Sequence, residues 1–493
     1  MSRPLFSPLL IAGWCALTLT SSFTSAHLTP VLAQGIEFGP VEVERKAAPA
    51  KKKPPAVQHL EPAAPGAETA PAAAAAPVPE AAAPAPAKAM PTAGKGGSLA
   101  SKYQTAGLPP PPKPANCKNT EGFEIWLAAF RKEAAANGVS QATIRAALDG
   151  RTLDTGVIAR DRKQGFFAQS FTDFSAKLAT PSRVNAGKAQ IKKNAEAFAR
   201  VAKDYGVPAS VITGFWALES DFGSGMGKLP ILNSLTTLAY DCRRGEMFRT
   251  ELMAALEIID RGDMRPDTMI GSWAGEIGQT QFLPTRYLAH AIDYDGDQEI
   301  NLFANHTDII GSPANYMTHL GWRRDEPWLE EVLVTADLPW EKADLSLKLP
   351  RSQWAQWGVK RVDGSALEND AMPASLLLPM GRFGPAFLAY ENFNVYLQWN
   401  QSLNYAVTAA WMATRIDGAP LMQKPKREIA VLAPEEAKEL QRILTKRGFN
   451  VGEVDGKIGA ATRAAVKSMQ VKLGFPADSY PTPELLAALR GAS

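Results

Sequence analysis

Apolar residues recur at helical spacing through much of residues 116–420. The first such stretch lies between Thr120, which is suited to cap a helix, and Gly138, which is suited to end one. Its apolar stripe is formed by Phe123, Trp126, Leu127 and Phe130. Further helical patterns run through 160–178 and 188–205, whereas few runs alternate as strands do. The pattern predicts a mainly α-helical fold for this part of the chain.

The most informative pattern lies in residues 211–227, VITGFWALESDFGSGMG, which predict a buried helix that ends in a carboxylate. Pro208 suits its first turn and Gly223 suits its end. One face is shared by Ile212, Phe215, Trp216 and Glu219. A carboxyl group against an aromatic face loses hydration, which raises its pKa toward the range of a general acid. The same letters also fit a helix end at which Glu219 only bonds nearby backbone.

The N-terminal part has the composition of an exported protein. Arg3, an apolar run at 9–19 and small residues at 24–26 and 31–33 are typical of a secretory signal peptide, which we place at residues 1–33. A lipoprotein anchor is disfavoured because Trp14 precedes Cys15. No later stretch is apolar enough to span a membrane.

Residues 34–115 are dominated by alanine, proline and lysine and contain few large apolar residues. Such a segment cannot bury enough surface to offset its ordering entropy, so we expect a disordered linker. It can act as a tether or, through the lysines at 51–53, as a basic surface-binding arm.

A second proline- and lysine-rich linker, at residues 421–431, precedes a short C-terminal segment at 432–493. Apolar residues at helical spacing flank a tight turn at Asp455 and Gly456, which predicts a small three-helix bundle. Between the two linkers, the segment 337–378 fits helices less well and allows a few strands.

Composition excludes several classes of protein. A length of 493 residues indicates more than one folded unit, and a net charge of +3 implies no nucleic-acid partner. The histidines of the folded region form no zinc or Ser/His/Asp arrangement. Once the signal peptide is removed, Cys117 and Cys242 remain in an oxidising compartment, so either a disulfide or two free thiols is expected.

Residues 271–287, GSWAGEIGQTQFLPTRY, are the second informative block. Together with ALES at 217–220, AYD at 239–241, SPANY at 312–316 and GW at 321–322, they resemble the catalytic domain of the lytic murein transglycosylase B family. The resemblance extends from about Cys117 to about Arg415. It implies a lysozyme-like helical fold, no required cofactor, and cleavage of the MurNAc–GlcNAc bond of peptidoglycan without water, leaving a 1,6-anhydro sugar. The glutamate of ALES, here Glu219, would act as acid and then as base.

The resemblance also implies a set of residues that contact the glycan: Ser272, Gln281, Tyr316, Trp399 and Asn400. Trp399 replaces a more usual tyrosine, so stacking on a sugar can survive but a tyrosine hydroxyl contact cannot. The side chains of Gln279 and Gln281 also offer neutral hydrogen bonds to hydroxyls and acetamides. Glu276 is a second carboxylate in this region, and hydrolases that cleave glycosidic bonds use a pair of carboxylates. We interpret it as a helix-surface residue or structural partner.

Asp293 to Asn301, DYDGDQEIN, place acidic side chains at alternating positions around a glycine, as a calcium loop does. The loop departs from an EF-hand, since its glycine is fourth rather than sixth and Ala304 stands where the bidentate glutamate should be. The candidate ligands are Asp293, Asp295, Asp297 and Asp308, the last by resemblance to some family members. A structural calcium ion and a solvated acidic turn both remain open.

These patterns together predict a periplasmic, monomeric lytic transglycosylase that acts on peptidoglycan glycan strands. Its catalytic domain is placed at 116–420. The segment 432–493 resembles the small peptidoglycan-binding domain of many wall enzymes. The resemblance is carried by the pattern LQRILTKRGFNVGEVDGKIGAATRAAV. A hydrolytic muramidase and a non-catalytic wall-binding protein are the alternatives. Both would keep the same two domains.

Overall fold

The computed structural model describes residues 11–12, 15–16, 113, 116–162 and 169–491. The predicted signal peptide and N-terminal linker lie almost entirely outside these residues. Within the predicted signal segment, β1 (Ile11–Ala12) and β2 (Cys15–Ala16) pair as antiparallel strands. In the described part of the chain, no helix has both the length and the apolar character needed to cross a membrane.

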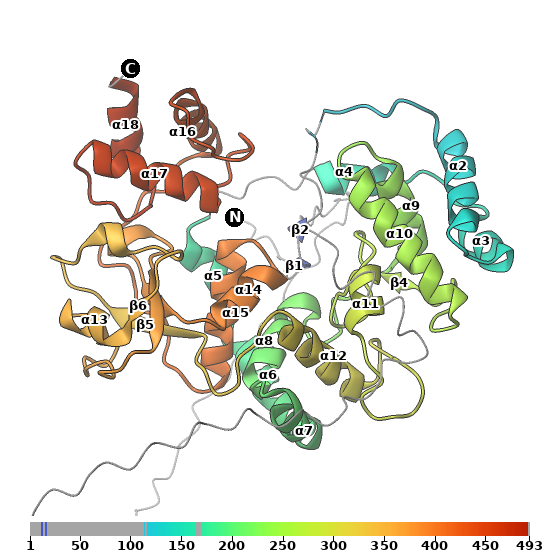
Figure 1. Ribbon diagram of the computed structural model, residues 1–493, viewed down its shortest axis with the longest axis horizontal. Coiled ribbons are helices and arrows are strands. Elements are labelled where there is room, and N and C mark those ends of the chain that lie inside the picture. The colour runs from blue at the N-terminus through green and yellow to red at the C-terminus, as the bar shows by residue number, and fades with distance from the viewer. Residues whose placement is uncertain (1–10, 13–14, 17–112, 114–115, 163–168, 492–493) are drawn as a thin grey trace, which may run out of the picture. The chain divides into compact units, whose positions relative to one another are not determined.

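The chain is mainly α-helical, as predicted, and its helices surround the buried helix that carries Glu219 (Figure 1). The helices before the sheet are α2 (Phe123–Ala136), α3 (Gln141–Leu148), α4 (Thr155–Arg162), α5 (Phe171–Leu178), α6 (Pro181–Lys193), α7 (Ala195–Tyr205), α8 (Ala209–Ser220), α9 (Ile231–Tyr240), α10 (Gly245–Asp260), α11 (Pro284–His290) and α12 (His306–His319). After the sheet come α14 (Phe393–Trp399) and α15 (Leu403–Ile416). The short strands β3 (Leu229–Pro230) and β4 (Ile270–Gly271) pair antiparallel.

Local sequence signals explain most helix ends. Ser140 caps α3 by accepting a hydrogen bond from the Thr143 backbone N–H at 3.2 Å. The expected cap of α2 was wrong, because the helix begins after Gly122 and Thr120 lies too far upstream to reach it. The helical pattern at 188–205 was expected to be continuous, but the structure divides it between α6 and α7. The chain leaves helical geometry at Asn194, between the two helices.

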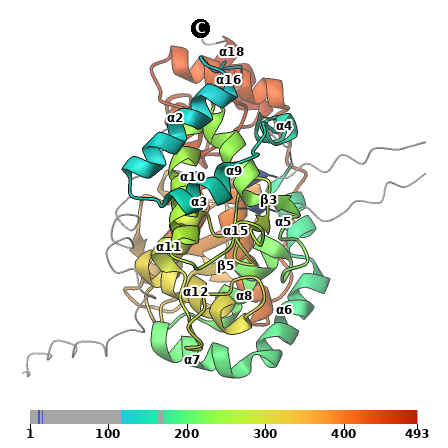
Figure 2. The same ribbon diagram turned by 90° about the vertical axis from the view of Figure 1, so that its right-hand side faces the viewer.

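Helix α8 lies in the centre of the main core, and every residue from Ser210 to Ser220 is buried. It packs beside α15, as both views show (Figure 1, Figure 2). Gly214 faces α15, and a Cβ atom there would stand 3.5 Å from the backbone of Ala409 and Ala413, which is ordinary van der Waals contact.

A five-stranded antiparallel sheet follows α12, with strand order β6-β8-β9-β5-β7. Its strands are β5 (Leu329–Leu333), β6 (Leu349–Pro350), β7 (Lys360–Arg361), β8 (Pro373–Leu377) and β9 (Ala386–Ala389), with α13 (Arg351–Gln356) between β6 and β7. Two short 3₁₀ turns, η1 (Trp340–Lys342) and η2 (Gly381–Phe383), connect its elements. The sheet has its own apolar cluster around Trp354, whose indole N–H donates to the Ala374 carbonyl at 2.9 Å. Strands were expected only within 337–378, and the sheet extends beyond that range at both ends.

The C-terminal segment folds as the predicted three-helix bundle, α16 (Pro434–Lys446), α17 (Ala460–Lys472) and α18 (Pro483–Gly491). It has a separate apolar core that includes Leu440, Val466 and Leu489. The predicted tight turn is held by Gln441, whose Oε1 accepts from the Gly456 backbone N–H at 2.7 Å. Gly456 has φ +82°, a conformation that favours glycine.

Candidate active site

Glu219 lies near the end of α8, and its side chain is removed from solvent, with 1% of the residue exposed. Its Oε1 accepts two hydrogen bonds, from Trp399 Nε1 at 2.8 Å and from the Tyr405 hydroxyl at 2.5 Å. These donors come from α14 and α15, so three helices meet at one carboxyl group. Burial disfavours the charged form of a carboxyl group, whereas hydrogen bonds donated to it favour that form.

The chain turns sharply directly after Glu219. Asp221 and Phe222 have φ +49° and +57°, left-handed values that are strained for residues with side chains. Arg183 Nε contacts the Asp221 carboxylate at 3.0 Å, and the Ser220 hydroxyl accepts from the Gly223 N–H at 3.0 Å. These contacts hold the turn, and the turn holds the end of the helix that carries Glu219.

Trp399 sits inside an aromatic cluster. Its ring centroid lies 4.4 Å from that of Phe215, 5.3 Å from that of Tyr316 and 5.8 Å from that of Phe282. We expected the change from tyrosine to tryptophan to remove a polar contact. The indole N–H instead supplies one, directly to Glu219. Stacking of Trp399 on a sugar stays a prediction.

The loop between β4 and α11 brings several of the predicted residues beside α8. Gln279 bonds to the protein through both ends of its amide, since its Oε1 accepts from Trp216 Nε1 at 2.8 Å and its Nε2 donates to the Phe303 carbonyl at 2.7 Å. It therefore ties the loop to α8, and its hydrogen bonding to a ligand stays a prediction. Gln281 adopts φ +49°, and its Nε2 donates to the Gly278 carbonyl at 2.8 Å. Backbone strain at a non-glycine residue is common at functional sites.

Ser272 and Glu276 form a buried pair in the same loop. The Ser272 hydroxyl donates to Glu276 Oε2 at 2.7 Å, and both residues are buried. The interpretation of Glu276 as a helix-surface residue was wrong, because it lies in a loop and is 1% exposed. Burial is the main cause that raises the pKa of Glu276 well above its usual range, and the charge of Glu219 raises it further.

Tyr316 and Asn400, the other two predicted contacts, are both buried. The Arg286 guanidinium stands 4.5 Å from the centre of the Tyr316 ring, and the His290 ring centroid is 4.6 Å away. Asn400 Oδ1 accepts from the Ser402 N–H at 2.9 Å. The structure therefore shows how the protein holds these side chains, and their contact with a glycan remains a prediction.

Three of the four predicted calcium ligands lie together, with carboxylate oxygens of Asp293, Asp295 and Asp297 within 4.8 Å of one another. Asp308 lies outside this group, so its part in a metal site stays a prediction. Its two oxygens accept from the backbone N–H groups of Tyr294 and Asn301, each at 2.8 Å. Asp308 thus closes the loop through backbone contacts, and its burial raises its pKa to about 6.

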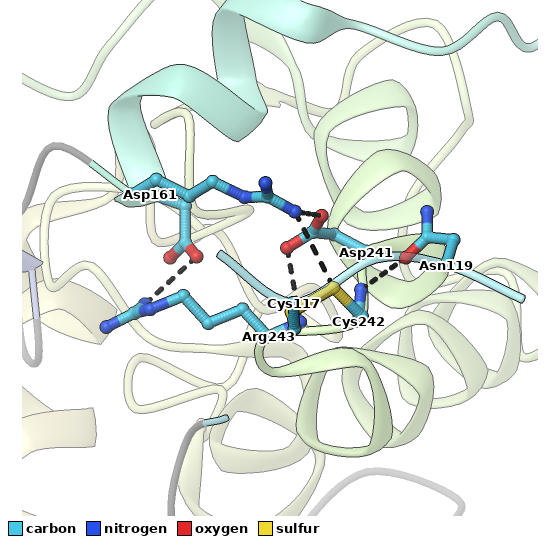
Figure 3. The surroundings of a disulfide bond; sticks show 7 residues. Cys117, Asn119, Asp161, Asp241, Cys242 and Arg243 are labelled. Atoms are coloured by element: carbon cyan, nitrogen blue, oxygen red, sulfur yellow. Dashed lines mark hydrogen bonds and ion pairs between the residues drawn. A yellow bond between two sulfur atoms is a disulfide. The ribbon is translucent and has the colours of Figure 1, made fainter. Parts of the chain in front are cut away.

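Cys117 and Cys242 form a disulfide, the first of the two alternatives left open by the sequence (Figure 3). It joins the segment before α2 to the segment after α9. The Asn119 side chain accepts from the Cys242 N–H at 2.7 Å, and Arg162 pairs with Asp241 at 2.5 Å beside it.

Comparisons with known proteins fit this site. The chain matches the Transglycosylase SLT domain family over residues 122–414, more than half its length, and belongs to that family. Residues 434–489 match a peptidoglycan binding domain.

Among its relatives, the chain is 32% identical over 239 residues to membrane-bound lytic murein transglycosylase B of Escherichia coli (strain K12). That match covers 48% of this chain and 64% of the relative, so it spans less than two thirds of the relative's length. Among solved structures, SltB3 from Pseudomonas aeruginosa, in complex with NAG-anhNAM-pentapeptide, has 38% identity and a TM-score of 0.70. The match covers 75% of this chain and all of that one. Escherichia coli Slt35 in complex with calcium has 28% identity and a TM-score of 0.52, with 59% and 92% covered.

Proposed function

We propose that the protein is a lytic transglycosylase that cleaves the MurNAc–GlcNAc bond of peptidoglycan and leaves 1,6-anhydroMurNAc ends. The observation that carries the proposal is the isolation of Glu219 from solvent together with its two hydrogen-bond donors, Trp399 and Tyr405. Membership of the transglycosylase family and the SltB3 complex with a NAG-anhNAM-pentapeptide support it.

In the first step, neutral Glu219 protonates the oxygen of the scissile bond, and the bond from that oxygen to C1 of MurNAc breaks. Glu219 is now ionised, and the N–H of Trp399 and the hydroxyl of Tyr405 stabilise its charge. In the second step Glu219 removes the proton from the MurNAc 6-hydroxyl, whose oxygen bonds to C1. Glu219 is neutral again, and no water is consumed.

We also propose Ser272, Gln281, Tyr316, Trp399 and Asn400 as the residues that contact the glycan. The proposal includes a periplasmic location, action as a monomer, and delivery to the wall by residues 432–493. The match of 434–489 to a peptidoglycan binding domain supports the last point.

A hydrolytic muramidase would use the same carboxyl group but would deliver water to C1, and Glu276 supplies a second buried carboxyl group. A wall-binding protein without activity would give no products. Mass spectrometry of purified sacculi after digestion separates the three functions, because anhydro ends, reducing ends and intact sacculi are distinct outcomes. We expect anhydro ends.

We further propose that Asp293, Asp295 and Asp297 hold a structural calcium ion. Carboxylate oxygens are the ligands that calcium prefers, and the Slt35 structure is described as a calcium complex. Calcium bound to the folded state alone should raise the melting temperature. After chelation, millimolar calcium should restore that temperature in the wild type but not in Asp295→Asn. Equal melting curves with and without calcium would reject the site.

A further inference from the structure

The loop between β4 and α11 carries a buried glutamine for which the proposed reaction has no step. Gln279 is 6% exposed, and both ends of its amide are bonded to the protein. Its Oε1 accepts from the indole N–H of Trp216, and its Nε2 donates to the Phe303 carbonyl. An indole N–H can only donate and a carbonyl can only accept, so these two partners fix the orientation of the amide. An amide does not titrate, so neither contact depends on a protonation state.

The acceptor end of the amide holds the helix that carries Glu219. Trp216 lies three residues before Glu219 on α8 and is 2% exposed. The Trp216 carbonyl accepts from the Phe222 N–H at 3.4 Å, and the two rings meet edge to face with centroids 5.4 Å apart. Trp216 therefore contacts the turn that follows Glu219 as well as Gln279. Its position affects the backbone on both sides of Glu219.

The same amide lies directly against that turn. A Cβ atom at Gly223 would stand 2.7 Å from the side-chain amide of Gln279, closer than real Cβ atoms approach. Gly223 also has φ +92°, a conformation that favours glycine. Gln279 thus contacts residues that come before and after Glu219 in the chain.

The donor end of the amide is held by residues 302–303, which precede α12. In addition to the side-chain bond to Phe303, the backbone N–H of Gln279 donates to the Leu302 carbonyl at 2.8 Å. Leu302 is fully buried in the main core. Two hydrogen bonds therefore anchor Gln279 to the core, and through it they hold Trp216 and Gly223.

We propose that Gln279 is a positioning residue for the reaction. Its amide holds Trp216 and the turn at 221–223 in place, and thereby fixes the carboxyl group of Glu219 against its two hydrogen-bond donors. A reacting group that is misplaced by about 1 Å can slow a reaction about a hundredfold, so this support matters for the chemical step. The inference rests on the proposed role of Glu219.

The test removes the contact from each side, with Gln279→Met and Trp216→Phe, and measures cleavage of soluble glycan chains well below the melting temperature. Methionine matches the length of glutamine but has no amide. In each variant kcat should fall about tenfold while KM changes less than about twofold, because the reacting group is displaced and the proposed glycan contacts remain. The double variant should be about as slow as either single variant, since both changes remove the same contact. A rise in KM without a fall in kcat, or losses that multiply in the double variant, would overturn the proposal.

Gln441→Met and Trp354→Phe are the matched controls. Gln441 is a buried glutamine that holds the Gly456 turn of the C-terminal bundle, and Trp354 donates its indole N–H to a carbonyl within the sheet. Each control loses a buried hydrogen bond of the same kind, so it should be destabilised to a similar extent. Its kcat on soluble chains should stay within about twofold of the wild-type value. Controls as slow as the site variants would show that lost stability explains the effect, and would contradict the proposal.

Nitrogen-15 spectra of the tryptophan indole groups measure the positioning without turnover. The Trp399 indole N–H donates to Glu219 Oε1, so its signal, assigned by its loss in Trp399→Phe, reports the geometry at the carboxyl group. The signal should shift in Gln279→Met and stay unchanged in Gln441→Met. An unshifted Trp399 signal in folded Gln279→Met would overturn the proposal.

Product analysis separates a failure of this inference from a failure of the proposed function. Reducing ends from the wild type would reject the transglycosylase reaction, yet a shifted Trp399 signal would still support positioning by Gln279. If Gln279→Met does not fold, Trp216→Phe carries both measurements with the same expected and contradicting results.

Discussion

At the scale of single residues, the chemistry depends on a balance at Glu219 between burial, which disfavours charge, and two donated hydrogen bonds, which favour it. A group that must act first as acid and then as base needs both influences.

We predict that Tyr405→Phe lowers kcat about tenfold, because a hydrogen bond to a charged group contributes about 1.5–3 kcal/mol. Losing this donor favours protonated Glu219, so the alkaline limb should move to higher pH. Tyr396→Phe is the control. Tyr396 is equally buried, and its hydroxyl has no partner among the described residues. Equal effects of the two changes would contradict a specific role for Tyr405.

Glu251 should make stability depend on pH. Burial raises its pKa from the usual range of a glutamate to about 7. Since its folded pKa lies above its unfolded one, its contribution to stability is complete below the unfolded value and is lost as the pH rises through about 7. Glu251→Gln cannot ionise, so the loss of unfolding free energy between about pH 5 and about pH 8 should shrink by up to about 3 kcal/mol. Urea unfolding at both pH values checks this, and an unchanged difference would contradict it.

Some residues of the site were predictable from sequence and others were not. Glu219 was predictable because it lies in a recognisable motif and on an apolar helix face, and both are local features of the sequence. Tyr405 was not predicted, because its contact with Glu219 joins residues 186 positions apart. Glu276 was misplaced for a similar reason, since burial of a loop residue depends on distant elements. Asp308 was grouped with the calcium loop by resemblance to some family members, and no local sequence signal indicated its backbone partners.

At the scale of elements, α8 is the part of the fold that sequence predicted best. Its burial on all sides follows from its apolar composition. The sheet was harder to predict, because β6 and β7 have only two residues each and depend on pairing with distant strands. The break at Asn194 was hidden because the helical period continues across it.

The disulfide is predicted to stabilise the helical domain. It joins residues 125 positions apart, and removing a cross-link over so long a loop typically costs about 2–5 kcal/mol. The double change Cys117→Ser and Cys242→Ser should lower the melting temperature and expose the segment before α2 to proteases. Reduced wild type should behave like the variant. Identical melting and proteolysis of variant and oxidised wild type would show that the disulfide contributes nothing.

At the scale of the whole chain, the C-terminal bundle contacts the sheet region through polar groups. Arg382 pairs with Asp478 at 3.3 Å, Lys467 pairs with Asp344 at 2.7 Å, and Arg463 donates to the Leu378 carbonyl at 2.7 Å. The sequence predicted a short linker but contained no signal for these contacts, since surface charges pair in ways that no local pattern specifies.

We predict that a chain ending at Arg427 keeps most of its turnover of soluble glycan chains but digests sacculi at least about tenfold more slowly, because tethering raises the local concentration of substrate. Full-length Lys467→Ala is the control. It breaks one contact between bundle and sheet but keeps the bundle, and it should digest sacculi normally. Equal losses on soluble and insoluble substrates would instead indicate that the bundle only stabilises the catalytic domain.

The most direct test of the central claim compares wild type with Glu219→Gln by mass spectrometry of the fragments released from purified sacculi. Glutamine preserves the size of the side chain but can neither give nor take the catalytic proton. The wild type should release fragments with 1,6-anhydroMurNAc ends, and the variant should release at least about a hundredfold less while still binding sacculi and melting normally. Reducing ends from the wild type, or variant activity within a few fold of it, would contradict the account.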